Sequence, residues 1–215
     1  MGVMPASACL NDVNPHLVNF YRWLATGLRT DLPMENEETM FYRHRDRFNG
    51  LLRSGKENSR EAAALFYFLN RTGFNGLCRF NQQGEFNVPF GRYKRINYVR
   101  DFTAYQQAFS RWEFTNTDVE RVELRPGDFV YADPPYDVEF TQYAMDGFSW
   151  EDQERTAVFL TAHPGPVILV NQATARVRKL YRKLGYRVRF FEAPRRISCT
   201  GDRTPAREIM GLRNL

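Results

Sequence analysis

Cysteine is scarce in this sequence of 215 residues, and its spacing excludes two common uses of thiols. Cys9, Cys78 and Cys199 lie far apart with no paired spacing, which argues against a disulfide framework or a zinc site. The three histidines are equally scattered, so no metal cofactor is expected. A reducing compartment, the cytoplasm, fits this usage best.

Long apolar runs are also absent. The N-terminal stretch has no basic region followed by an apolar segment, and no apolar run approaches the roughly 20 residues that a membrane span needs. We therefore expect a soluble, unexported protein without membrane contact. Its length allows one sizeable core with room for a small appended lobe.

Positive charge is concentrated in one segment. Residues 71–100 contain six basic side chains and one acidic side chain, so this segment alone accounts for the net charge of +5. The aromatic residues interleaved with that charge are Phe74, Phe80, Phe86, Phe90, Tyr93 and Tyr98. Cations bind phosphates and rings stack on bases, so this composition is typical of a nucleic-acid-binding surface. A solvated basic loop is an equally good interpretation of these residues alone.

Helical periodicity dominates the first third of the chain. It predicts helices near 15–27, 36–54 and 58–73, the first capped by Asn14 and the third by Asn58. Residues 74–100 are interpreted as a loop-and-ribbon insertion, in which QQGEFNVPFG is typical of a turn with short extended arms. Beyond them, helices are expected at 102–110, from Ser149, and at 173–183, and strands at 112–116, 129–132, 166–171, 186–191 and 207–213. This alternation predicts a mostly parallel α/β sheet.

The strand at 129–132 ends on an unusual run, Asp133, Pro134, Pro135 and Tyr136. Ligands of parallel sheets bind at the carboxyl edge, where this run lies. The Asp133 carboxylate and a carbonyl of the proline pair could accept both hydrogens of an exocyclic base amine, which aims its lone pair at a methyl donor. Tyr136 could stack on that base, which would first have to be flipped out of a duplex. A proline-rich turn that closes a strand is the alternative.

Two further polar residues end apolar strands. Asp12 follows a short apolar stub and precedes a helix, where a carboxylate can accept hydrogen bonds from ribose hydroxyls. A plain helix-entry residue is the simpler interpretation of Asp12 from these residues alone. Asn171 lies at the same sheet edge as Asp133 and could line the same pocket.

The run NRTGFNGLCRFNQQGEFNVPFGRYK, residues 70–94, closely resembles the matching segment of DNA adenine methyltransferases (Dam), and DPPY is the amino-methyltransferase motif of that family. The resemblance extends from LNDVNPHL to RRISCTGDRTPAREIMGLRN. It implies a Rossmann-like α/β sheet that uses S-adenosylmethionine, with a small helical and β-ribbon subdomain for DNA recognition. The implied catalytic domain comprises 1–27 and 112–215, and the recognition subdomain comprises 28–111.

The resemblance also implies an activity and its residues. A monomer would transfer a methyl group from S-adenosylmethionine to N6 of a flipped adenine in double-stranded DNA, within GATC. The catalytic loop would be Asp133, Pro134, Pro135 and Tyr136, with Asp12 and Asp133 at the cofactor. Arg79 would read guanine, and Phe74, Asn75 and Leu77 would insert beside the target base. The remaining contacts to bases and phosphates would be Pro89, Arg92, Tyr93, Lys94 and Arg95.

One departure from the family pattern concerns the start of the chain. Members open with a K-W-x-G-G-K-like segment and a first strand that carries an F-x-G-x-G loop, whereas only eleven residues precede Asp12 here. A strand, a helix and a second strand need roughly 30 residues. We therefore expect an N-terminally incomplete sheet. If residues 1–215 are the real product, we also expect weak or absent S-adenosylmethionine binding and poor stability. A start assigned too far downstream, a degenerate fragment, and a shortened protein completed by a partner are the three explanations.

Two other functions remain open from the sequence. The first is a truncated, catalytically inactive remnant that retains DNA binding only. The second is a cytosine N4 methyltransferase, since that reaction also methylates an exocyclic amine. The segment around Arg79 favours adenine.

Overall fold

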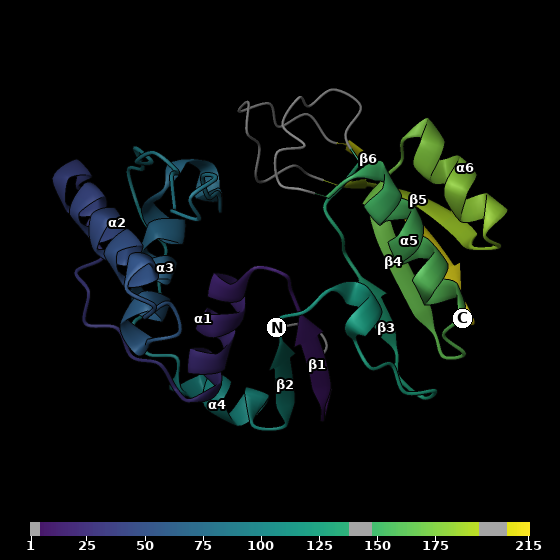
Figure 1. Cartoon of the computed structure of the whole chain (residues 1–215), viewed down its shortest axis with the longest axis horizontal. Helices are drawn as coiled ribbons and strands as arrows, with labels where there is room; N and C mark the ends of the chain where they lie inside the picture. Colours follow the sequence, from purple (N-terminus) through teal and green to yellow (C-terminus); the bar gives the residue numbers. More distant parts are fainter. Residues whose placement is uncertain (1–4, 138–147, 194–205) are drawn as a thin grey trace. The chain divides into compact units, whose positions relative to one another are not determined.

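The computed structural model describes residues 5–137, 148–193 and 206–215 (Figure 1). The chain divides into two compact units, unit 1 (Met1–Asp118) and unit 2 (Val119–Leu215). Both contain helices and strands, so the expected α/β class is confirmed at this coarse level. None of the helices in the described ranges is long and apolar enough to span a membrane.

Unit 1 combines four α-helices of the described ranges with a two-stranded parallel sheet. Its elements are β1 (Ala8–Asn11), α1 (Pro15–Ala25), α2 (Glu38–Arg53), α3 (Arg60–Thr72), the 3-10 turn η1 (Phe74–Gly76), α4 (Thr103–Phe109) and β2 (Trp112–Thr115). β1 and β2 pair in register from Ala8 opposite Trp112 to Asn11 opposite Thr115. The helices expected in the first third are therefore present.

The helix starts follow from local capping chemistry. The Asn14 side chain accepts hydrogen bonds from the backbone N–H groups of His16 (3.0 Å) and Leu17 (3.2 Å), as expected for a cap before α1. The expected cap of α3, Asn58, is wrong by one residue. Ser59 has the extended backbone of a cap and accepts the Ala62 N–H at 3.1 Å.

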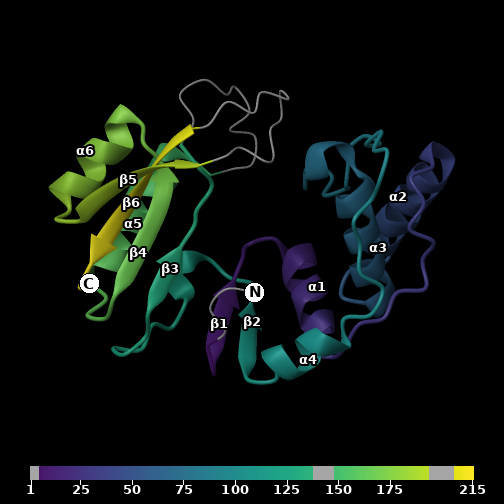
Figure 2. The same cartoon turned by 180° about the vertical axis from the view of Figure 1, so that it is seen from behind.

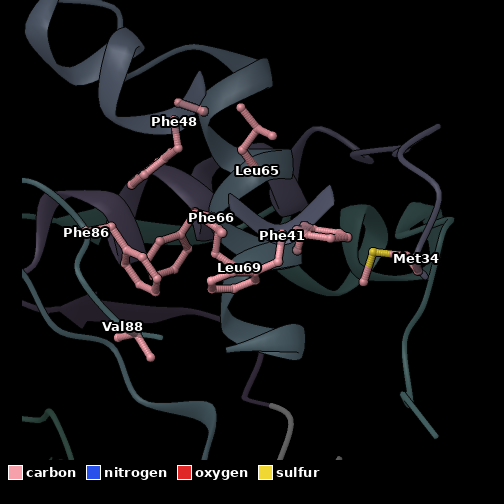
Figure 3. Packing of buried hydrophobic residues seen from close by; sticks show 10 residues of the cluster. Met34, Phe41, Phe48, Leu65, Phe66, Leu69, Phe86 and Val88 are labelled. Carbon is pink, nitrogen blue, oxygen red and sulfur yellow. The ribbon is translucent and has the colours of Figure 1, made fainter. Parts of the chain in front are cut away.

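An aromatic core lies between α2, α3 and the basic segment (Figure 3). Phe48 of α2 and Phe68 of α3 are completely buried. The basic segment contributes Phe86 and Val88, with exposed fractions of 1% and 0%. Burial of each such side chain stabilises the fold by about 1.5–3 kcal/mol, so the basic segment is held by its apolar residues.

Unit 2 contains a four-stranded sheet in the order β3-β4-β6-β5. Its elements are η2 (Val119–Arg121), β3 (Val130–Ala132), α5 (Trp150–Thr161), β4 (Val167–Gln172), α6 (Ala175–Lys183), β5 (Arg187–Ala193) and β6 (Ala206–Arg213). β3 and β4 are parallel, whereas β6 lies between β4 and β5 and is antiparallel to both. The expectation of a mostly parallel sheet is therefore wrong for β6. Consecutive strands that lie side by side pair antiparallel when the chain turns straight back.

Helices α5 and α6 of unit 2 share one hydrophobic cluster with the sheet. Ala157 of α5, Val177 of α6 and Leu169 of β4 are each at most 1% exposed in this cluster. α5 lies in front of the sheet in Figure 1 and behind it in Figure 2. A capping box starts α5, because Ser149 and Asp152 exchange side-chain-to-backbone hydrogen bonds.

Replacement of Phe48 by alanine tests the role of the aromatic core. We expect the free energy of unfolding of unit 1 to fall by about 3–5 kcal/mol, because a completely buried ring is lost and a cavity remains. Urea denaturation measures this change. The control, Val13→Ala, removes a side chain that is 70% exposed and should change stability by less than about 0.5 kcal/mol. Equal effects of the two variants would contradict the assignment of this core.

Candidate functional site

The DPPYD loop, residues 133–137, leaves the carboxyl end of β3 and contacts two buried amides, one at the end of β4 and one on α5. Asn171 of β4, with no exposed surface, accepts the backbone N–H of Asp137 at 2.8 Å. The same side chain donates to Gln153 Oε1 of α5 at 2.9 Å. Gln153 Nε2 in turn donates to the Pro135 carbonyl at 2.6 Å. A closed path of hydrogen bonds thus fixes the loop on β4 and α5.

The end of this loop is fixed to α6 by a buried carboxylate. Asp137 is 6% exposed and accepts hydrogen bonds from Thr174 Oγ1 (2.7 Å) and from Arg176 Nε (2.8 Å) and Nη2. Burial by itself would raise the pKa of Asp137, but the hydrogen bonds from Arg176 and Thr174 outweigh it and lower the pKa. Arg176 also lies over the Trp150 ring, 4.5 Å from its centroid. The carboxylate is therefore ionised and held at neutral pH.

The rest of the loop carries the polar groups of the candidate site. Tyr136 Oη donates to Glu208 Oε2 of β6 at 2.9 Å. Desolvation and then the charge of Glu208 raise the pKa of Asp133. Within the described ranges, no group donates a hydrogen bond to the Asp133 carboxylate or to the Pro134 carbonyl. Both oxygen acceptors are thus available in this part of the structure.

Asp12 lies at the carboxyl end of β1 and serves the entry to α1. Its Oδ1 accepts the Asn14 N–H at 2.7 Å, and its backbone carbonyl accepts Asn116 Nδ2 at 2.8 Å. Asp12 thus takes part in the helix entry through Oδ1, while Oδ2 receives no hydrogen bond from the described residues. Asp12 belongs to unit 1 and Asp133 to unit 2. Their joint action on one cofactor stays a prediction.

The basic segment forms a ribbon, residues 73–93, over the aromatic core of unit 1. Its tip turns at 81–85, where the Asn81 N–H donates to the Glu85 carbonyl at 2.8 Å. Behind the tip, Asn49 of α2 pairs with both backbone groups of Phe86, at 2.9 and 3.1 Å. Asn49 therefore takes the place of a neighbouring strand. The expected turn with extended arms is confirmed, and Asn49 is its unforeseen anchor.

Close backbone contact fixes the base of the ribbon. The Phe74 N–H donates to the Pro89 carbonyl at 2.8 Å, and Tyr93 Oη donates to the Gly73 carbonyl at 2.9 Å. A side chain at Gly91 would place its Cβ 2.5 Å from the Tyr93 ring and 2.8 Å from Gly73 O, so only glycine fits there. The residues around the cavity of about 290 Å³ at this point are Phe74, Asn75, Phe90, Gly91, Arg92 and Tyr93.

The structure brings the expected DNA contacts together on this ribbon and just beyond it. Arg79 is exposed, and its Nε and Nη2 donate to the Asn87 side chain and carbonyl at 2.8 and 3.1 Å. Arg92 pairs with Glu38 at 3.1 Å on the surface. The residues that are exposed are Phe74, Arg79, Pro89, Arg92, Lys94 and Arg95, and those half-buried are Asn75, Leu77 and Tyr93.

The turn at Asp12 contacts the same ribbon. Asn14 Nδ2 donates to Cys78 Sγ at 3.3 Å, and the His16 ring stacks on Phe80 with centroids 4.7 Å apart. Unit 1 therefore holds the candidate cofactor carboxylate and the candidate DNA contacts in one packed region.

Sequence reasoning missed four residues of these sites, Asn49, Asn87, Gln153 and Glu208. Three of them, Asn49, Gln153 and Glu208, lie on a helix or strand outside the segment that they contact. The fourth, Asn87, lies across the ribbon from Arg79. A lone amide in an apolar helix face is the one signal that could have identified Asn49 and Gln153, because buried polar groups need partners. No sequence signal marks Glu208 on β6.

An acceptor-bearing loop at a strand end and a basic aromatic ribbon in the same chain suit a protein that modifies nucleic acid. The sequence profile of the D12 class N6 adenine-specific DNA methyltransferases matches residues 4–194, and the chain belongs to this family. The resemblance drawn from the sequence is thereby confirmed.

Named relatives agree with this assignment. The DNA N-6-adenine-methyltransferase of Escherichia phage P1 is 35% identical over 94% of this chain and 29% of its own length. The retron Ec67 DNA adenine methylase of Escherichia coli is 33% identical over 94% of this chain and 74% of its own length. The DNA adenine methylase of Escherichia coli strain K12 is 32% identical, with coverages of 94% and 78%. This chain thus spans less than a third of the phage protein.

Replacement of Asp137 by asparagine tests how the loop is held. We expect the free energy of unfolding of unit 2 to fall by about 1–3 kcal/mol at neutral pH, because charged hydrogen bonds are lost. The Arg176 side chain is partly exposed, which favours the lower end of this range. The native pKa of Asp137 lies below its usual 3.8. Its stabilisation is therefore present above that value and is lost as the pH falls through the native pKa.

Urea unfolding followed by tryptophan fluorescence at neutral and acidic pH measures this difference. Glu154→Gln, at an exposed carboxylate of α5, is the matched control and should leave stability unchanged. A destabilisation by Asp137→Asn that stays constant down to acidic pH would contradict the role of the charge.

Proposed function

We propose that this protein methylates N6 of adenine in double-stranded DNA, with S-adenosylmethionine as donor and GATC as target. The proposal includes a Rossmann-like methyltransferase fold, with a catalytic domain of 1–27 and 112–215 and a recognition subdomain of 28–111. It rests on membership of the D12 class family and on the geometry of the DPPYD loop.

The observation that carries the proposal is the buried network under the DPPYD loop. Gln153 engages the Pro135 carbonyl, which leaves the Pro134 carbonyl and the Asp133 carboxylate as acceptors. These two oxygens accept the two amino hydrogens of adenine and draw N6 towards tetrahedral geometry. The lone pair of N6 would then face the methyl group that S-adenosylmethionine supplies, and after the transfer the surplus proton of N6 would leave to solvent. Because the loop is fixed before the base arrives, little reorganisation is needed in the reaction.

S-adenosylmethionine would supply an electrophilic methyl group on a sulfonium sulfur. Asp12 suits its ribose hydroxyls, because Oδ1 already holds the helix entry and Oδ2 is an acceptor at a strand end. Asp133 is the second residue that we assign to the cofactor. No cluster of three or more potential metal ligands occurs among the residues that the structure describes.

The ribbon of unit 1 is proposed to bind the duplex. Arg79 presents a planar guanidinium, preset by Asn87, that suits bidentate contact with O6 and N7 of a guanine. Phe74, Asn75 and Leu77 would occupy the space left by the flipped adenine. Asn75 has φ of 52°, a strained backbone for a residue other than glycine, as is common at ligand-binding loops. The other proposed contacts to bases and phosphates are Pro89, Arg92, Tyr93, Lys94 and Arg95.

Methylation of a GATC-containing duplex with labelled S-adenosylmethionine tests the activity. We expect incorporation into adenine that falls at least about 100-fold in Asp133→Ala, because one of the two amine acceptors is removed. A duplex in which GATC is changed at the adenine is the substrate control. Duplex binding without any turnover by the wild type would overturn the enzymatic proposal and support a binding remnant.

Two matched substitutions, one on the ribbon and one just beyond it, test DNA recognition. Arg79→Ala should lose about 1–3 kcal/mol of discrimination at one base pair, because a bidentate base contact disappears. Lys94→Ala should weaken all duplexes equally and lower the salt dependence of binding by about one phosphate contact. Fluorescence anisotropy against GATC and single-substituted duplexes at several salt concentrations measures both. The same uniform loss in both variants would refute the reading role of Arg79.

A further inference from the structure

Glu208 joins the candidate site from a strand that carries none of the expected site residues. It is the third residue of β6 and pairs with Gln172 of β4, next to the buried Asn171. Its side chain is half-buried, and Oε2 accepts the hydrogen bond of the Tyr136 phenol at 2.9 Å. A carboxylate from β6 is thus held against the DPPYD loop.

The phenol contact restrains the Tyr136 ring. Hydrogen bonds between a hydroxyl and a carboxylate are roughly twice as strong as neutral ones. Burial, the Glu208 hydrogen bond and the Asp133 charge together raise the pKa of Tyr136 far above its usual 10.0, so the phenol stays protonated and continues to donate. The fixed φ of the preceding proline restrains the loop, and Glu208 holds the far end of the ring. The ring face is therefore set before any base stacks on it.

Glu208 acts on Asp133 as well. The titratable groups that meet Asp133 in the described part of unit 2 are Glu208 of β6 and the phenols of Tyr131 and Tyr136. After desolvation, the negative charge of Glu208 is the cause that raises the pKa of Asp133. Asp133 accepts an amine hydrogen most strongly while it is ionised, so a raised pKa moves the weakening of this acceptor to a higher pH.

We propose that Glu208 is a positioning residue of the methyltransferase site: it fixes the Tyr136 ring on which adenine stacks, and its charge beside Asp133 sets the acidic limit of the reaction. This role rests on the proposed function of the DPPYD loop. A merely structural role of Glu208 at the start of β6 would leave the pH dependence of the site unchanged.

Four variants separate these roles. E208Q keeps an oxygen acceptor for the phenol and removes the charge, whereas E208A removes both. Y136F keeps the ring and removes the phenol donor. E154Q, at the exposed carboxylate of α5, controls for the loss of one negative charge and should match the wild type.

Steady-state methylation of a GATC duplex across acidic and neutral pH gives the first measurement. We expect E208A and Y136F to lower kcat by about 10- to 100-fold with little change in KM, the loss of one charged hydrogen bond. The E208A/Y136F double variant should be no slower than either single variant, because both remove the same bond. E208Q should retain a larger kcat than E208A. In E208Q, the fall of kcat on acidification should also occur at a lower pH than in the wild type.

A second measurement does not need an active enzyme. The carboxyl carbon of Asp133, assigned with D133N in a 13C-labelled sample, should titrate at lower pH in E208Q than in the wild type and E154Q. An unchanged Asp133 titration in folded E208Q overturns the proposal, whether or not the wild type methylates DNA. If the Asp133 titration shifts in E208Q but the wild type shows no methylation, the proposed function is refuted, and the effect of Glu208 on Asp133 is still supported. A kcat for E208A equal to that of E154Q, in an active wild type, also overturns the positioning role.

Discussion

The hydrogen bonds of Asn171 are the constraint on which the DPPYD loop depends. Asn171 is fully buried in β4, where an unpaired amide would cost about 1–3 kcal/mol. It meets this need with one bond to the Asp137 backbone and one to Gln153. The same bonds force the chain after β3 to follow one path. The stability of the sheet and the shape of the candidate site therefore have a common cause.

In unit 1, buried side chains likewise hold the ribbon in one conformation. Residues 71–100 carry the net charge and could not form a core of their own. Phe86 and Val88 point into the aromatic cluster, and Asn49 satisfies both backbone groups of Phe86. The exposed Arg79 and its neighbours are thus carried on a rigid support. A ribbon that is ordered in advance loses less conformational entropy on binding a duplex.

Much of the local structure follows from short-range chemistry, which explains why it was predictable. The Asn14 cap, the helix from Ser149 and the turn at 81–85 depend on residues within a few positions of each other. The direction of β6 was not predictable in the same way. Its alternating pattern suits either a parallel or an antiparallel neighbour, and the choice depends on which strand it meets. The cap of α3 was misplaced by one residue because Asn58 and Ser59 both favour that position.

The sequence by itself determined the family, the DPPY run and the composition of the ribbon, since each is a property of adjacent residues. Only the tertiary structure decided three further features. These are which proline carbonyl accepts the Gln153 hydrogen bond, which oxygen of Asp12 accepts the Asn14 N–H, and the contact between Glu208 and Tyr136. Glu208 and Tyr136 are 72 positions apart. Contacts over such a separation depend on strand order and register, which no local pattern encodes.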